Sequence, residues 1–171
     1  MRPDLEALGA SIAGQAKIAH EVLQTPWCHA GRRRFVMEKI VWKPEYSVGV
    51  ERLDRQHQRI IKVINTLIAK PGIFIRSASI ADALSELTSY VSEHFLLEEQ
   101  LLEENNYPNL IDHVKRHTEY GEQIANFYLK KIENNKNVPR QLLNYLSEWW
   151  VGHILHEDMK YKSFFKDKGI R

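Results

Sequence analysis

Apolar residues recur three or four positions apart along four stretches of the chain, a spacing that places them on one face of an α-helix. The pattern predicts helices over about residues 54–70, 79–105, 109–134 and 139–160. Asp54 suits the N-cap of the first helix, which Pro71-Gly72 would end. Four helices with one apolar stripe each and short connections predict an all-α fold, an up-down-up-down four-helix bundle.

The same pattern divides the chain into an N-terminal extension and a bundle domain. Residues 1–36 are the predicted extension, with a weakly amphipathic helix expected from about residue 3 to 24 and ended by Pro26. Residues 37–171 are the predicted bundle domain. Within it, residues 40–53 are expected to form an extended arm whose aromatic side chains pack over one end of the bundle.

Charge and composition narrow the choice of partners. Residues 1–36 hold five basic and three acidic side chains, whereas residues 37–171 hold nineteen of each, so the bundle domain is formally neutral. A neutral domain argues against nucleic acid as the main partner. The apolar runs are too short to cross a membrane, and the N-terminus lacks the apolar core of a secretory signal. The single cysteine, Cys28, cannot form an internal disulfide, which fits a reducing compartment. We therefore expect a cytoplasmic protein and, because the apolar runs are short, no membrane partner.

Ionisable side chains interrupt the apolar stripes of all four predicted helices. The inward positions include five histidines and one glutamate, namely His57, His94, Glu98, His113, His117 and His153. Burying ionisable groups costs several kcal/mol apiece unless they are paired or bind a metal. A lone buried histidine is usually a hydrogen-bonded core residue, but five in one interior predict a metal centre.

The ligand types limit which metal the centre holds. No cysteine lies near these positions, which excludes thiolate zinc and iron–sulfur sites. Imidazole with carboxylate suits iron, zinc, copper or manganese. Five imidazoles exceed the needs of one ion, whereas two ions sharing bridging carboxylates would use them all. The Glu-x-x-His pairs of common dinuclear carboxylate bundles and the His-Glu-x-x-His zinc protease motif are both missing from the sequence.

Several motifs together resemble those of the bacterial hemerythrins over about residues 41–162. They are Trp42, Tyr46-Ser-Val-Gly-Val50, Asp54-x-Gln56-His57, His94-Phe-x-x-Glu98-Glu99, Tyr107-Pro108, His113-x-x-x-His117 and Trp149-x-x-x-His153-Ile-x-x-x-Asp158. The resemblance implies a pair of iron ions joined by an oxo or hydroxo oxygen. In the implied arrangement His113, His117 and His153 hold one iron, His57 and His94 hold the other, and Glu98 and Asp158 bridge the two.

The assignment of Asp158 follows the resemblance rather than helical spacing. Asp158 comes five residues after His153, about 140° around an ideal α-helix, so Glu157 is better aligned by that rule. We choose Asp158 and expect the helix to end or distort at this position.

The resemblance also implies that dioxygen binds at an open position on the iron with two histidines. Trp150 stands where the family usually has a leucine lining the dioxygen pocket, and Tyr120 stands where phenylalanine is common. Ile60 is assigned to the same pocket. The expected function is reversible dioxygen binding for storage, delivery or sensing, without catalysis. Two alternatives stay open: a diiron redox enzyme of the peroxidase, oxidase or nitric oxide reductase type, and an iron- or oxygen-responsive interaction module that contacts a protein partner through residues 1–36.

Overall fold

The computed structural model describes residues 38–69 and 77–171, and both the helix predicted in the N-terminal extension and the Pro71-Gly72 stop lie outside them. A short 3₁₀-helix, η1 (Pro44–Tyr46), precedes the bundle. The remaining elements are α2 (Glu51–Ala69), α3 (Ser77–Tyr90), η3 (Val91–Phe95), α4 (Leu96–Glu104), α5 (Leu110–Ile132), α6 (Val138–Trp149), η4 (Trp150–Asp158) and α7 (Met159–Asp167). Both η3 and η4 are π-helical segments.

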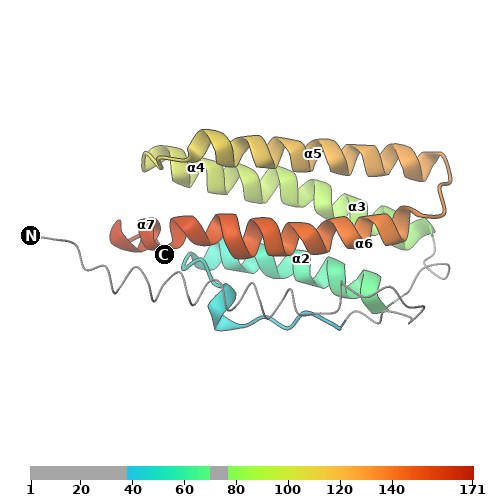
Figure 1. Cartoon of the computed structure of the whole chain (residues 1–171), viewed down its shortest axis with the longest axis horizontal. Helices are drawn as coiled ribbons and strands as arrows, with labels where there is room; N and C mark the ends of the chain where they lie inside the picture. The colour runs from blue at the N-terminus through green and yellow to red at the C-terminus, as the bar shows by residue number, and fades with distance from the viewer. Residues whose placement is uncertain (1–37, 70–76) are drawn as a thin grey trace, which may run out of the picture. The chain divides into compact units, whose positions relative to one another are not determined.

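These elements form four rods, because α3, η3 and α4 run on without a break, as do α6, η4 and α7. Each rod runs in the direction opposite to the one before it, so the predicted up-down-up-down bundle is confirmed (Figure 1). No β-strand occurs in residues 38–69 or 77–171. None of the helices described is both long and apolar enough to cross a membrane.

Asparagine residues in the left-handed conformation make the two turns flanking α5. Asn106 has φ 57° and Asn134 has φ 55°. Asparagine is one of the few non-glycine residues that adopts this region readily. The backbone N–H of Tyr107 then donates to Leu102 O at 2.9 Å, and that of Asn135 donates to Lys130 O at 3.1 Å, which satisfies carbonyls at the helix ends. Such turns are tight enough to place consecutive helices side by side.

The first and last helices differ from their predicted limits. Helix α2 begins at Glu51, so Asp54 lies inside its first turn and is not the N-cap. Its carboxylate instead accepts hydrogen bonds from Val48 N at 2.8 Å and Ser47 Oγ at 2.6 Å, which ties the preceding chain to the helix. At the other end, the fourth rod continues to Asp167, beyond the expected limit near residue 160.

The predicted arm lies along α2 rather than over an end of the bundle. Asn65 holds it at one point, accepting from Ile40 N and donating to Ile40 O, each at 2.8 Å. Tyr46 is buried, and its ring packs edge-on against Trp150 with centroids 5.5 Å apart. The arm therefore contributes to the core.

Two apolar clusters fill the bundle, one toward each end, and the polar inward positions lie between them. On α2, for example, Leu53 belongs to one cluster and Ile60 to the other, with His57 between. Tyr90 and Leu102 flank the second rod's polar positions in the same way. The helical stripes thus place one polar layer across the bundle, sealed on both sides by apolar side chains.

Candidate metal centre

Seven ionisable side chains meet in this polar layer. One group consists of His113, His117 and His153, and a second consists of His57, His94, Glu98 and Asp158. In each group, every residue offers one ligand atom, a nitrogen or an oxygen, and these atoms all lie within 4.8 Å of one another. Every one of the seven is buried. The structure therefore brings together all seven residues singled out as ligands from the sequence.

Both carboxylates lie between the two groups of histidines. Glu98 Oε1 is 2.6 Å from His113 Nε2, and Glu98 Oε2 is 3.0 Å from His94 Nε2. Asp158 Oδ1 is 3.1 Å from His153 Nε2, and Asp158 Oδ2 is 3.2 Å from His57 Nε2. Each carboxylate thus directs one oxygen toward either histidine group, the arrangement required to bridge two ions.

The π-helical segment η4 explains why Asp158, rather than Glu157, reaches the interior. A π-helix bonds residue i to residue i+5, so residues five apart share a face there. Asp158 is completely buried five residues after His153. The side chain of Glu157 instead lies 2.7 Å from Lys160 Nζ and 3.0 Å from the Nδ1 atom of the exposed His156. The distortion expected at this position is therefore a π-helical segment.

Two residues from other helices hold the outer nitrogens of the site histidines. Gln56 Oε1 lies 3.0 Å from His94 Nδ1, and Glu99 Oε1 lies 2.7 Å from His117 Nδ1. An acceptor at Nδ1 fixes the proton there and leaves the Nε2 lone pair free to bind metal. The sequence motifs contain Gln56 and Glu99, but spacing along one helix does not reveal contacts between helices, so neither received a role.

Three aromatic rings stack on the site histidines. The stacked pairs are Tyr90 with His94 (centroids 4.4 Å apart), Phe95 with His117 (3.7 Å) and Trp149 with His153 (3.8 Å). Tyr90 and Trp149 each precede their histidine by four residues, one helical turn, which is a signal that the sequence carries. These rings fix the imidazole planes and exclude water.

Burial keeps four of the imidazoles neutral. It lowers the pKa of His57 and of His94 to about 4, although Glu98 acts in the opposite direction on both. Burial also lowers the pKa of His153, helped by His117, and lowers that of His117 against the hydrogen bond with Glu99. Neutral imidazole is the form that binds metal, so these side chains need lose no proton near pH 7.

The two carboxylates interact strongly with each other and with His113. Burial alone would raise the pKa of Glu98, but the hydrogen bond with His113 and the nearby imidazole of His94 hold it well below its usual value. Burial and the negative charge of Glu98 raise the pKa of Asp158 well above its usual value. Burial opposes the charge on His113, yet Glu98 outweighs it and raises the pKa of that imidazole. Cations placed between these groups would remove the repulsion between the carboxylates.

Several buried polar atoms of the site have no hydrogen-bond partner among the described residues. They are His57 Nδ1 and Nε2, His94 Nε2, Glu98 Oε2, His153 Nδ1, and Asp158 Oδ1 and Oδ2. Each such atom costs about 1–3 kcal/mol if nothing satisfies it. Five of them, namely His57 Nε2, His94 Nε2, Glu98 Oε2 and both oxygens of Asp158, belong to the groups that face one another between the helices, so the side chains present fit a pair of bound metal ions.

Comparison with known proteins supplies the family. The family model described as "Hemerythrin HHE cation binding domain" matches residues 48–165. This chain belongs to that family. The match includes all seven side chains of the polar layer and confirms the resemblance seen in the sequence.

Named relatives of this hemerythrin domain come from several bacteria. A bacteriohemerythrin from Stenotrophomonas maltophilia is 29% identical over 126 residues, or 73% of this chain and 80% of its own. One from Pseudomonas paraeruginosa is 32% identical over 126 residues, with the same coverage of both chains. A third, from Clostridium acetobutylicum, is 26% identical over 125 residues, or 71% of this chain and 97% of its own.

The three residues expected to line a dioxygen pocket are buried in one apolar cluster of the hemerythrin domain: Ile60, Tyr120 and Trp150. The ring of Tyr120 lies 6.2 Å from that of Tyr90. Trp150 packs on Tyr46, on the arm. Their burial fits an apolar lining, and their role in binding dioxygen is a proposal.

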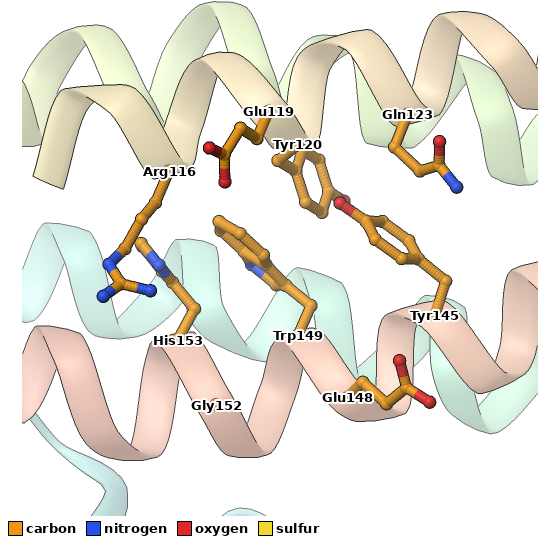
Figure 2. Close-up of a pocket in the computed structure, with 9 residues that line it drawn as sticks. All are labelled: Arg116, Glu119, Tyr120, Gln123, Tyr145, Glu148, Trp149, Gly152 and His153. Atoms are coloured by element: carbon orange, nitrogen blue, oxygen red, sulfur yellow. The ribbon is translucent and has the colours of Figure 1, made fainter. Parts of the chain in front are cut away.

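A surface cavity of about 390 Å³ opens between α5 and α6 of the hemerythrin domain, next to the polar layer. Tyr120 from α5 and Tyr145 and Trp149 from α6 project toward one another across it (Figure 2). His153, one of the seven, also lines this cavity. The polar layer is thus closed by apolar clusters along the bundle axis, and on this side its His153 forms part of the cavity wall.

Proposed function

We propose that this chain holds two iron ions inside its bundle and binds dioxygen reversibly there, as a store, carrier or sensor rather than as an enzyme. The observation that carries this proposal is the position of Glu98 and Asp158, each with one oxygen toward either histidine group. Membership of the hemerythrin family supports iron as the metal. The bacteriohemerythrin names of its relatives support dioxygen as the ligand.

The five histidines divide unequally between the two ions. In the proposed assignment His113, His117 and His153 hold one ion, and His57 and His94 hold the other, with Glu98 and Asp158 shared. Bound iron would supply a redox-active Lewis acid, and the ion held by fewer histidines would have room for a small ligand. Gln56 and Glu99 orient one imidazole of each group through its outer nitrogen.

The surroundings favour release of dioxygen unchanged over its further reduction, because reduction consumes protons. Apolar clusters lie on both sides of the polar layer and exclude water. Burial raises the pKa of Tyr90, Tyr120 and Tyr161 well above the usual value, so these hydroxyls keep their protons. An interior poor in available protons therefore suits a reversible binder. In the same proposal Ile60, Tyr120 and Trp150 line the space for dioxygen.

The test combines metal analysis with an optical spectrum. Purified protein should contain about two iron ions per chain, as expected for five imidazoles with two shared carboxylates. Its spectrum should change on aeration and return on removal of oxygen. His94→Ala should lose this response, whereas the exposed His156→Ala should retain it. Zinc or a single ion per chain would contradict the proposal, and steady turnover of peroxide or nitric oxide without a reversible change would identify a redox enzyme.

A further inference from the structure

Trp149 connects the surface cavity with the candidate metal centre. Its indole stacks on the imidazole of His153, with centroids 3.8 Å apart and planes 15° from parallel. The same indole lines the cavity (Figure 2). Among the described residues, three rings stack on site histidines, but Tyr90 and Phe95 are buried and do not line this cavity. Of these three stacked rings, Trp149 is therefore the one that a molecule in the cavity can contact, beside His153 itself.

The cavity combines an aromatic wall with an acidic rim. Trp149 and Tyr145 supply aromatic walls against which a planar ligand can pack. The rim carries Glu119 and Glu148 against one cation, Arg116. Burial raises the pKa of Tyr145, and the charges of Glu119 and Glu148 raise it further, so both carboxylates act on the interior of the cavity. A neutral or cationic aromatic molecule fits this field, and its hydroxyl groups can donate to the carboxylates, whereas an anion is repelled.

We propose that this cavity binds a small neutral dihydroxybenzene and that Trp149 passes its electrons through His153 to the metal centre. The proposal rests on the proposed function, because it requires two iron ions that can become ferric. It adds a route by which an oxidised protein returns to the state that binds dioxygen.

The electrons and protons of this reaction balance. Oxidation of one 1,4-dihydroxybenzene to the quinone breaks two O–H bonds and releases two electrons and two protons. Two electrons convert two ferric ions to ferrous ions, one electron each. The two protons pass to water at the open rim of the cavity. No further oxidant or reductant is needed.

Binding is tested first, with resorcinol, an isomer that does not form a quinone. Isothermal titration calorimetry of the iron-loaded full chain should show saturable binding. Gly152 lines the cavity, and a Cβ placed on it meets nothing within 4 Å, so the side chain of Gly152→Leu has room to start into the cavity. Gly152→Leu should abolish binding, and Trp149→Leu should weaken it about tenfold through loss of the stacked ring. Trp42→Phe, a tryptophan change away from the cavity, should leave it unchanged.

Electron transfer is tested next, by stopped-flow reduction of the ferric protein. The reduction rate should saturate as the hydroquinone concentration rises. It should be several-fold lower in Trp149→Phe, which keeps an aromatic ring but removes the indole. Trp42→Phe should keep the rate, and negatively charged hydroquinone sulfonate should react much more slowly than hydroquinone. Iron content and the visible spectrum of each variant are measured beforehand to show an intact centre.

The outcomes separate this proposal from the proposed function. Absence of saturable resorcinol binding, or equal reduction rates in Trp149→Phe and the parent chain, overturns the electron route while leaving reversible dioxygen binding intact. Less than two iron ions per chain overturns the proposed function, and with it the electron route even if resorcinol binds.

Discussion

Asp158 and Glu157 are neighbours in sequence with opposite surroundings. Asp158 is completely buried beside His57 and His153, whereas Glu157 is paired with Lys160 near the surface. We predict that Asp158→Ala lowers the iron content to about one ion per chain or less, because a shared ligand is lost. Glu157→Ala should retain both ions. Metal analysis and the visible spectrum measure the effect, and the reverse result would make Glu157 the ligand.

The burial of His57 predicts how the iron-free protein responds to acid. Its pKa falls from an ordinary 6.5 to about 4 in the folded chain, chiefly through burial. As the pH falls through this window, the unfolded chain takes up a proton that the folded chain refuses, so folding loses stability. At the lower end of this window, near pH 4, protonation of this one group in the unfolded chain should have lowered the unfolding free energy by about 3 kcal/mol. Above pH 6.5 the cost is absent.

The His57→Leu variant isolates this contribution. Urea unfolding of the iron-free proteins gives the difference in stability between variant and parent at each pH. The unfolding free energy of the variant should rise relative to that of the parent as the pH falls from 6.5 to 4. His156→Leu, at a side chain 64% exposed, is the matched control for replacing a histidine by leucine. A constant difference for His57→Leu would show that its imidazole is not held neutral by burial.

Single residues of the site could be predicted where their own helix determines their direction. The spacing of His94 and Glu98, or of His113 and His117, places each pair on one face without further information. Gln56 and Glu99 could not be assigned this way, because their contacts depend on rotamers and on the offset between neighbouring helices. Trp149 was visible one turn before His153, but spacing alone does not distinguish a stacked ring from ordinary core packing.

At the scale of elements, the π-helical segment η4 is the feature on which the site depends. It spans Trp150–Asp158 and brings residues five apart onto one face. We predict that deleting the exposed His156 restores an ordinary α-helix. His153 and Asp158 would then lie four residues apart, again on one face. The deletion should keep about two iron ions per chain.

A deletion in α5 is the matched control. Removing the exposed Lys115 leaves His113 and His117 three apart and rotates the rest of the helix by about 100°. This variant should lose iron, because α5 contains no π-helical segment that could return to α-helical geometry when one residue is removed. Circular dichroism shows whether each protein is folded. A folded His156 deletion without iron would show that the five-residue spacing itself is required.

The hydrophobic pattern predicts the helices better than it predicts their exact first residues or their local geometry. The apolar stripes predict four helices, but they place the start of α2 near Asp54, whereas the helix begins at Glu51. From inside the helix, the Asp54 carboxylate accepts hydrogen bonds from Val48 and Ser47, so it acts on the preceding chain as an N-cap would. An acidic residue near a helix start is compatible with either position. Neither η3 nor η4 was predicted as a π-helix, because the periodicity rule assumes α-helical geometry throughout. The expected distortion near Asp158 came from the family resemblance alone.

For the whole molecule, the fold could be predicted because periodicity, turns and ligand positions all agree. Four apolar stripes require four helices packed around one core, and short turns require that neighbours run antiparallel. The polar layer lies within the same stripes, so packing the helices also assembles the site. The direction of the arm along α2 could not be predicted in this way, since it depends on contacts between segments far apart in the sequence, such as those of Ile40 with Asn65 and of Tyr46 with Trp150.

The division of the chain at residue 36 gives a final prediction at this scale. Residues 38–69 and 77–171, the part that the structure describes, supply all seven polar side chains and the two apolar clusters named above, and the family match begins at residue 48. A chain lacking residues 1–36 should therefore keep its iron content and its reversible response to oxygen, with a change in unfolding free energy within about 0.5 kcal/mol. Metal analysis, the aerated spectrum and urea unfolding test this. Lost iron would make these residues part of the domain, whereas intact iron with lost binding of a protein partner would identify them as an interaction segment.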